Sequence, residues 1–103
     1  MLIIAGTFKL DPSKRQAFIA DAASMIAASA KEDGCYRYTF CIDPVDDSLV
    51  QVYERWESQE HLQAHIATEH SKVWNETVAP KYDFTKDIMK YRIDKVSDIL
   101  EWD

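Results

Sequence analysis

Two runs of alternating residues, 35–42 and 49–56, flank a short turn-rich segment, and this pattern constrains the fold more than any other. Large apolar side chains alternate with smaller or polar ones, as expected for strands whose two faces differ. The linking segment is rich in Asp and contains Pro and Ser, which is typical of a turn. A β-hairpin is therefore predicted, with Tyr36 and Tyr38 on one face of its first strand and Glu54 and Trp56 on one face of its second.

The remaining segments complete an alternation of strands and helices. Asp11 and Pro12 are typical of a helix start, Gly34 of a helix end, and Ser58 and Pro80 of the two ends of a second helical region. The order β-α-β-β-α-β predicts a ferredoxin-like α+β fold, in which an antiparallel four-stranded sheet carries helices on one face. Besides the hairpin, the predicted elements are a strand over 2–10, a helix over 13–33, helical segments over 59–68 and 71–78, a strand over 84–93 and a tail over 93–103.

Length and charge narrow the class of protein. The chain has 103 residues and a net charge of −6, so residues 1–103 are expected to form one domain. The basic residues are scattered, and without a basic stripe we expect neither nucleic acid nor an anionic membrane as a partner. No apolar run approaches the roughly 20 residues of a membrane span. The first residues lack the basic lead of a signal peptide, so we expect none.

The two cysteines help to predict the cellular compartment of the protein. Cys35 and Cys41 lie in one predicted strand, where their separation of six positions spans roughly 20 Å. A disulfide requires Cα atoms within about 7 Å of each other, so both are expected to remain free thiols. Free thiols and the expected lack of an export signal predict a cytoplasmic protein.

One face of the predicted sheet has no helix to cover it. That face still carries apolar side chains, and a bare apolar face favours association with another surface. A second copy of the chain is the simplest cover, so the sequence predicts a homodimer. The apolar and acidic tail over 93–103 is either frayed or docked on the partner subunit.

All three histidines of the chain fall between positions 61 and 70, soon after the strand that ends at Trp56. Helical spacing places His65 on the side of its helix that faces the sheet. Histidine is the side chain best suited to accept a proton near neutral pH, which makes His65 a candidate general base. Glu69, four residues later, is placed to orient the imidazole, and Glu54 is a second candidate partner.

Three stretches resemble the antibiotic biosynthesis monooxygenase family, which includes small quinol monooxygenases. They are Gly34-Cys35-Tyr36-Arg37-Tyr38, Tyr53-Glu54-Arg55-Trp56, and the run from Ser58 through His65 to His70. The resemblance spans residues 1–93 and implies a dimeric α+β barrel, with a pocket in each subunit between the helices and the sheet. It also implies oxidation of a phenol or quinol by O₂ as co-substrate, with no cofactor expected.

The chemistry that such an oxidation requires suggests roles for individual residues. His65 and Glu54 are the expected catalytic pair. The expected substrate-binding residues are Trp56, Tyr38, Tyr36, His70 and Glu69. Aromatic rings would wall the pocket, and tyrosine hydroxyls can donate to an oxyanion.

Haem is not expected as a cofactor. Haem-degrading members of the superfamily carry Trp where His65 stands and a haem-ligating His where Asn75 stands. An Asn cannot supply the axial ligand that His gives to haem iron. His61 and His65 share a helix face, as metal ligands can, but spacing fixes no third ligand, so no metal site is predicted.

Other interpretations stay open at the level of sequence. The same base serves an isomerase or another proton-transfer enzyme without O₂. A non-enzymatic ligand-binding or stress-associated dimer needs no chemistry in the pocket. Structural roles also fit: Trp56 in the core, Tyr36 and Tyr38 at a subunit interface, and His70 at a helix junction. Alternation alone does not identify which strand face meets the helices.

Overall fold

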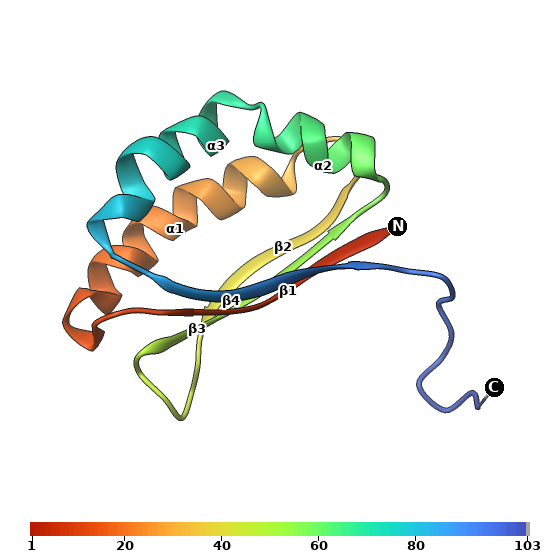
Figure 1. Cartoon of the computed structure of the whole chain (residues 1–103), viewed down its shortest axis with the longest axis horizontal. Helices are drawn as coiled ribbons and strands as arrows, with labels where there is room; N and C mark the ends of the chain where they lie inside the picture. Colours follow the sequence, from red (N-terminus) through yellow and green to blue (C-terminus); the bar gives the residue numbers. More distant parts are fainter. Residues whose placement is uncertain (103) are drawn as a thin grey trace.

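Four antiparallel strands form one sheet, in the spatial order β2-β3-β1-β4. The computed structural model describes residues 1–102, and Figure 1 shows the helices on one side of this sheet. The order of the elements confirms the predicted ferredoxin-like α+β fold. The strands are β1 (Leu2–Lys9), β2 (Cys35–Ile42), β3 (Leu49–Trp56) and β4 (Thr85–Arg92).

Asp11 caps a 3-10 turn over Pro12–Lys14, and the α-helix itself runs over Arg15–Ala30 instead of the predicted 13–33. The helix over Gln59–Ile66 begins at its predicted cap, Ser58. The Asp11 carboxylate accepts a hydrogen bond from the Ser13 backbone N–H at 3.0 Å, and the Ser58 hydroxyl accepts one from the His61 N–H at 3.3 Å. These bonds satisfy donors that the first helical turn leaves unpaired. The helical elements are the 3-10 turn η1 (Pro12–Lys14), α1 (Arg15–Ala30), α2 (Gln59–Ile66), α3 (Glu69–Val73), the π-helical turn η2 (Trp74–Val78) and the 3-10 turn η3 (Ala79–Lys81).

The second helical region differs from its prediction. Thr68 leaves the helical conformation, with φ −67° and ψ 156°, and its hydroxyl accepts a hydrogen bond from the Ser71 N–H. α3 therefore begins at Glu69 rather than near position 71. Pro80 does not end the helical backbone, which continues to Lys81, because a proline in the first turn of a helix lacks only an N–H that would be unpaired there.

The hydrophobic core lies between the helices and the side of the sheet that faces them. α1 buries one face at helical spacing, and Phe18 and Trp56 are among the fully buried side chains. Burying a large apolar side chain stabilises a fold by about 1.5–3 kcal/mol, so this layer contributes strongly to stability. The buried positions include Leu2, Phe8, Phe18, Ala22, Met25, Tyr38, Val50, Val52 and Trp56.

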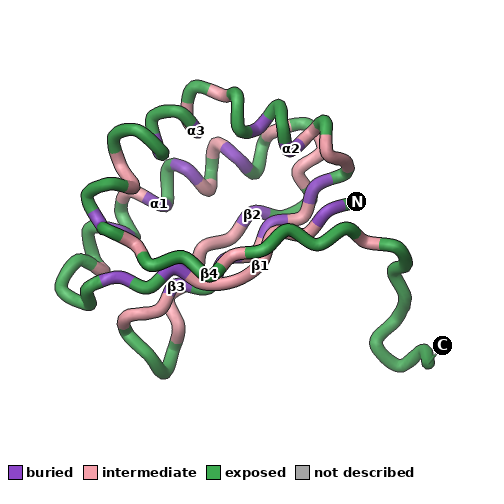
Figure 2. Tube along the Cα trace, in the orientation of Figure 1, coloured by how far each residue is buried: buried purple, intermediate pink, exposed green. Residues whose placement is uncertain are grey.

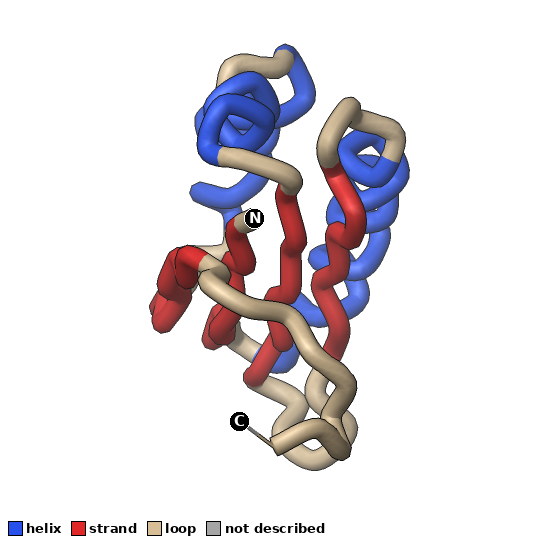
Figure 3. Tube along the Cα trace, turned by 90° about the vertical axis from the view of Figure 1, so that its right-hand side faces the viewer, coloured by secondary structure: helices blue, strands red, loops and turns tan. Residues whose placement is uncertain are grey.

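The structure identifies which strand face meets the helices. Glu54 and Trp56 lie on this inner face of β3 and are buried. Figure 3 shows that the helices gather on one side of the sheet, so the opposite, outer face stays open in this chain. Met89 and Tyr91 on β4 lie on the outer face and are 62% and 52% exposed. The bare apolar face predicted from the sequence is thus present.

A β-bulge corrects the predicted alternation of the first hairpin strand. The register with β3 shifts between Cys35 and Arg37, so one extra residue is accommodated on β2. That residue is Tyr36, which is 48% exposed and donates a hydrogen bond from its hydroxyl to Glu57. Tyr36 therefore does not share the inner face with Tyr38.

The C-terminal segment leaves the sheet after β4 and extends away from it (Figure 1). Figure 2 shows most of this segment as exposed, and Trp102 is 87% exposed. Position 103 of the predicted tail lies outside the described residues. Among residues 1–102, no helix combines the length and the apolar character required to cross a membrane.

Candidate active site

A cavity of about 330 Å³ lies between the helical layer and the sheet. We call it the inner chamber. Its sheet side includes Tyr38 and Glu54, and its helix side includes Leu62, His65 and Trp74. Most of its lining residues are apolar, and polar groups that reach such surroundings interact more strongly than they would in water.

His65 reaches the chamber from α2 and is 6% exposed. Its Nδ1 lies 2.6 Å from Glu32 Oε2, and with the proton on Nδ1 the ring donates a hydrogen bond to this carboxyl oxygen. The other nitrogen, Nε2, lies 3.5 Å from Ser71 Oγ and keeps its lone pair while the ring is neutral. The rings of Trp56 and Tyr38 pack nearby, with centroids 4.7 and 5.3 Å from that of the imidazole. The site thus holds the ring in the orientation that a base requires.

The carboxylate that orients His65 is not the predicted one. Glu69 begins α3 and lines another cavity, whereas Glu32, just beyond the end of α1, makes the hydrogen bond. The spacing argument failed because Thr68 interrupts the helix, so Glu69 does not lie one helical turn from His65. One feature of the sequence indicated Glu32. A negative charge at the C-terminal end of a helix interacts unfavourably with the helix dipole, so an acidic residue there is expected to have a role other than stabilising the helix.

His70 approaches the same carboxyl oxygen from α3. Its Nε2 donates to Glu32 Oε2 at 2.9 Å, and its ring centroid lies 6.0 Å from that of His65. We call Glu32, His65 and His70 the Glu–His–His cluster; one potential ligand atom from each lies within 4.8 Å of the other two. His61 stays apart from this cluster, with its Nε2 3.1 Å from a carboxyl oxygen of Glu57.

Glu54 reaches the chamber from β3 and is 8% exposed. Its Oε1 accepts a hydrogen bond from the Trp56 indole N–H at 3.0 Å. Burial raises the pKa of Glu54 to about 7, although the bond from Trp56 acts in the opposite direction. A carboxyl group with such a pKa can accept or release a proton near neutral pH. The two predicted catalytic residues therefore line one chamber.

The tyrosines and cysteines of β2 fall into different environments. Burial, together with the charge of Glu54, raises the pKa of Tyr38, so its phenol stays protonated and able to donate. Tyr36 lies outside the chamber because of the bulge. Cys35 and Cys41 are free thiols, as predicted, and burial raises the pKa of Cys35 to about 11, which leaves this thiol a poor nucleophile at neutral pH.

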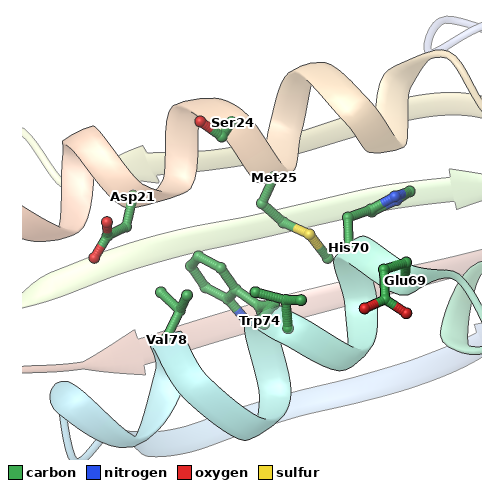
Figure 4. Close-up of a pocket in the computed structure, with 8 residues that line it drawn as sticks. Asp21, Ser24, Met25, Glu69, His70, Trp74 and Val78 are labelled. Carbon is green, nitrogen blue, oxygen red and sulfur yellow. The ribbon is translucent and has the colours of Figure 1, made fainter.

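A second cavity, of about 420 Å³, opens between α1 and the segment formed by α3 and η2 (Figure 4). We call it the outer groove. Asp21, Glu69 and His70 supply its charged and titratable groups. Met25 and Trp74, which Figure 4 shows extending into the space between the two helical segments, line both the groove and the chamber. These two side chains therefore form a partition between them.

Comparison with known proteins identifies the family. The family model described as "Antibiotic biosynthesis monooxygenase" matches residues 1–77. The chain belongs to this family. The "Probable quinol monooxygenase YgiN" of Escherichia coli, a relative of this family member, is 33% identical over 89 residues, which cover 76% of this chain and 85% of YgiN. An uncharacterized protein of Synechocystis is 33% identical over 67 residues, and the match covers 65% of this chain and 46% of that relative.

Solved structures share the fold of this antibiotic biosynthesis monooxygenase family member. A structure from Deinococcus radiodurans has a TM-score of 0.85 and 19% identity, and the match covers 98% of this chain and 100% of that chain. A structure from Nitrosomonas europaea has a TM-score of 0.82 and 21% identity, covering 92% of this chain and 100% of that chain. At these identities the likeness concerns the fold alone.

Proposed function

We propose that this chain is a small monooxygenase that oxidises an aromatic or quinol-type molecule with O₂ and without a bound cofactor. The observation that carries the proposal is the buried imidazole of His65, which faces an apolar chamber and has Glu32 behind it. Family membership supports the reaction class, and the name of YgiN supports the substrate class.

The first step is the removal of a proton from a substrate hydroxyl. His65 Nε2 would accept this proton, and the Glu32 carboxylate would stabilise the imidazolium that forms. The hydroxyl of Tyr38 would donate to the resulting oxyanion, while Trp56 forms part of the aromatic surroundings.

The electron-rich anion then reacts with O₂. One oxygen atom enters the product and the other leaves as water. A quinol that becomes a hydroxyquinone supplies all of the electrons for this reduction, so the reaction requires no separate reductant. Exclusion of water by the apolar lining would protect reactive intermediates from hydrolysis.

An isomerase or another proton-transfer enzyme is the second candidate. The observation that favours it is the presence of two proton acceptors, His65 and Glu54, in one chamber. Such a pair can remove a proton at one position of a substrate and return it at another without O₂.

We also propose that the protein acts as a homodimer in the cytoplasm. The exposed side chains of Met89 and Tyr91 on the outer sheet face support the dimer. The free thiols of Cys35 and Cys41 support a reducing compartment.

Oxygen uptake with a panel of quinols and phenols tests the reaction, and His65→Ala tests the base. We expect O₂ consumption in proportion to product, and a loss of kcat/KM of about 10²–10⁴-fold in the variant. His61→Ala is the matched control, because His61 contacts Glu57 rather than the cluster, and it should retain turnover. Substrate conversion without O₂ uptake would favour the isomerase, and full turnover by His65→Ala would contradict the assigned base.

A further inference from the structure

The Glu–His–His cluster combines two imidazoles with one carboxylate. The groups come from three separate segments: His65 from α2, His70 from α3, and Glu32 from the turn after α1. Their spacing in the sequence does not predict this proximity, which results from the tertiary structure. Their potential ligand atoms are Nδ1 of His65, Nε2 of His70 and a carboxyl oxygen of Glu32, all within 4.8 Å of one another.

We propose that Glu32, His65 and His70 form a binding site for a divalent first-row transition metal cation. Two imidazole nitrogens and one carboxylate are a recurrent ligand set for Zn²⁺ and Fe²⁺ in enzymes, and they leave at least one coordination position open. Imidazole ligands also argue against Mg²⁺ and Ca²⁺, which prefer oxygen donors.

The distances allow this coordination with small side-chain movements. Bonds from Zn²⁺ to imidazole nitrogen and to carboxylate oxygen are about 2.0–2.2 Å, so ligand atoms around a tetrahedral ion lie about 3–3.5 Å apart. The two nitrogens of the cluster now lie 2.6 and 2.9 Å from Glu32 Oε2. A cation would therefore replace two hydrogen bonds with coordination bonds after shifts of less than about 1 Å.

The environment of the cluster supports the site. The side chains of Glu32 and His65 are 14% and 7% exposed, so both ligands are held in place, while His70 is 30% exposed and offers a route of entry. The buried hydroxyl of Ser71 lies 3.5 Å from Nε2 of His65 and can accept a hydrogen bond from it when Nδ1 binds the cation.

The cation and the substrate proton would compete for His65, and this part of the inference rests on the proposed function. When Nδ1 binds a cation, the neutral ring carries its proton on Nε2 and has no lone pair to accept another. The metal-bound form would therefore lack the base and would be inactive in oxidation. The site would make the enzyme sensitive to zinc.

Titration of the metal-stripped chain with Co²⁺ tests the binding site. We expect visible absorption bands that saturate at one Co²⁺ per chain and disappear when Zn²⁺ is added, because both ions accept the same ligands. Glu32→Gln and His70→Gln should each weaken Co²⁺ binding by at least about tenfold. His61→Gln is the matched control and should bind Co²⁺ as the unmodified chain does, because His61 lies outside the cluster.

Three outcomes would overturn the site: no saturable Co²⁺ absorption at millimolar concentration, equal binding by the unmodified chain and both cluster variants, or a loss of binding in His61→Gln. If Glu32→Gln fails to fold, His70→Gln still provides the comparison with the unmodified chain, because the His70 side chain is only partly buried. Circular dichroism of each variant verifies folding before the titration.

Turnover measurements separate this inference from the proposed function. Saturable, cluster-dependent Co²⁺ binding in a chain that oxidises no quinol supports the metal site and contradicts the proposed oxidation. Oxidation in a chain that binds no Co²⁺ contradicts the metal site alone. Where both occur, Zn²⁺ should inhibit oxidation at the concentration that displaces Co²⁺, and uninhibited turnover at full occupancy would overturn the competition for His65.

Discussion

At the scale of single residues, two proton acceptors face the inner chamber from opposite walls. His65 reaches it from α2 with Glu32 behind its ring, and Glu54 reaches it from β3 with the indole N–H of Trp56 as a hydrogen-bond donor. Burial disfavours the charged form of a carboxyl group and raises the pKa of Glu54. Protonation of Glu54 is therefore coupled directly to the stability of the fold.

Glu54→Gln should change how stability depends on pH. Because burial raises the pKa of Glu54 from 4.5 to about 7, the folded chain retains a proton that the unfolded chain releases between these values. The free energy of unfolding contributed by Glu54 therefore falls as the pH rises from about 4.5 to 7, by at most about 3 kcal/mol. Gln cannot ionise, so the variant does not undergo this loss. The free energy of unfolding of Glu54→Gln minus that of the unmodified chain should therefore be larger at pH 8 than at pH 5, as measured by urea unfolding.

Glu76→Gln is the control for this substitution, because Glu76 is exposed on η2. It should leave the pH dependence of unfolding as it is in the unmodified chain. A parallel pH dependence of Glu54→Gln and the unmodified chain would show that Glu54 is ionised throughout this range, against the expectation from its burial.

The sequence located His65 and Glu54 but not Glu32. Both predicted residues belong to regular elements, so periodicity groups each of them with the side chains that share its face. Glu32 lies after the last turn of α1, where no period applies, and its contact with His65 depends on how α1 and α2 pack together. Long-range contacts of loop residues are set by the tertiary structure, which local patterns do not encode.

At the scale of elements, the departures from regular geometry decide which side chains reach the chamber. The bulge in β2 places Cys35 opposite Trp56 and directs Tyr36 outward. The π-helical turn η2 begins at Trp74, one of the two residues that separate the groove from the chamber. Alternation and helical spacing assume unbroken geometry, so the sequence predicted these elements but not their irregular positions.

Substitution of the two glycines should separate two kinds of steric strain. Gly6 has a φ of 150°, and a Cβ there would lie 1.9 Å from the backbone oxygen of Asp87 on β4. Gly34 has a φ of 76°, and its Cβ would meet the side chain of His61 at 2.3 Å. We expect Gly6→Ala to cost at least about 3 kcal/mol because the backbone cannot move aside, and Gly34→Ala about 1–2 kcal/mol. Urea unfolding measures both.

A double variant supplies the control for Gly34. In Gly34→Ala with His61→Ala, the side-chain clash is removed and only the unfavourable φ remains, so part of the lost stability should return. Equal losses of unfolding free energy in Gly6→Ala and Gly34→Ala would contradict the close approach of β1 and β4. Hydrogen exchange of the β4 amides is a second test of this approach.

At the scale of the whole molecule, the two faces of the sheet differ, and in the proposed homodimer the outer face would meet the partner. The inner face carries the core, and the outer face carries exposed apolar side chains of β4.

Met89→Arg should therefore convert a dimer into a monomer, because an isologous interface would bury the new charge twice. Val45→Arg is the control, since Val45 is equally apolar and 94% exposed in the turn between β2 and β3. Sedimentation equilibrium measures the mass of each variant.

The apolar tail should contribute to the same association. Ile99, Leu100 and Trp102 are exposed in the single chain, and burying such side chains against a partner is favourable. Truncation after position 93 should weaken dimerisation by at least about tenfold, the equivalent of about 1.4 kcal/mol. An unchanged dissociation constant in the truncated chain would place the tail outside the interface.

The general architecture was predictable because each element carries its own local signal. Caps at Asp11 and Ser58, the turn between the hairpin strands, and strict alternation in β3 each depend on neighbouring residues only. The rules for short, right-handed connections leave few arrangements for elements in this order, and the ferredoxin-like sheet is one of them. The identity of a ligand, by contrast, depends on the shape of a chamber to which many elements contribute one or two side chains.

The partition formed by Met25 and Trp74 bears on how quickly a molecule reaches His65. Both side chains turn about single bonds, and the unbranched thioether of methionine adapts readily to several rotamers. Passage from the groove to the chamber would require these two side chains to rotate, and both are buried in their present positions. The fastest rotamer changes are those of exposed side chains, so rotation of this buried pair would help to set how quickly a substrate reaches His65 by this route.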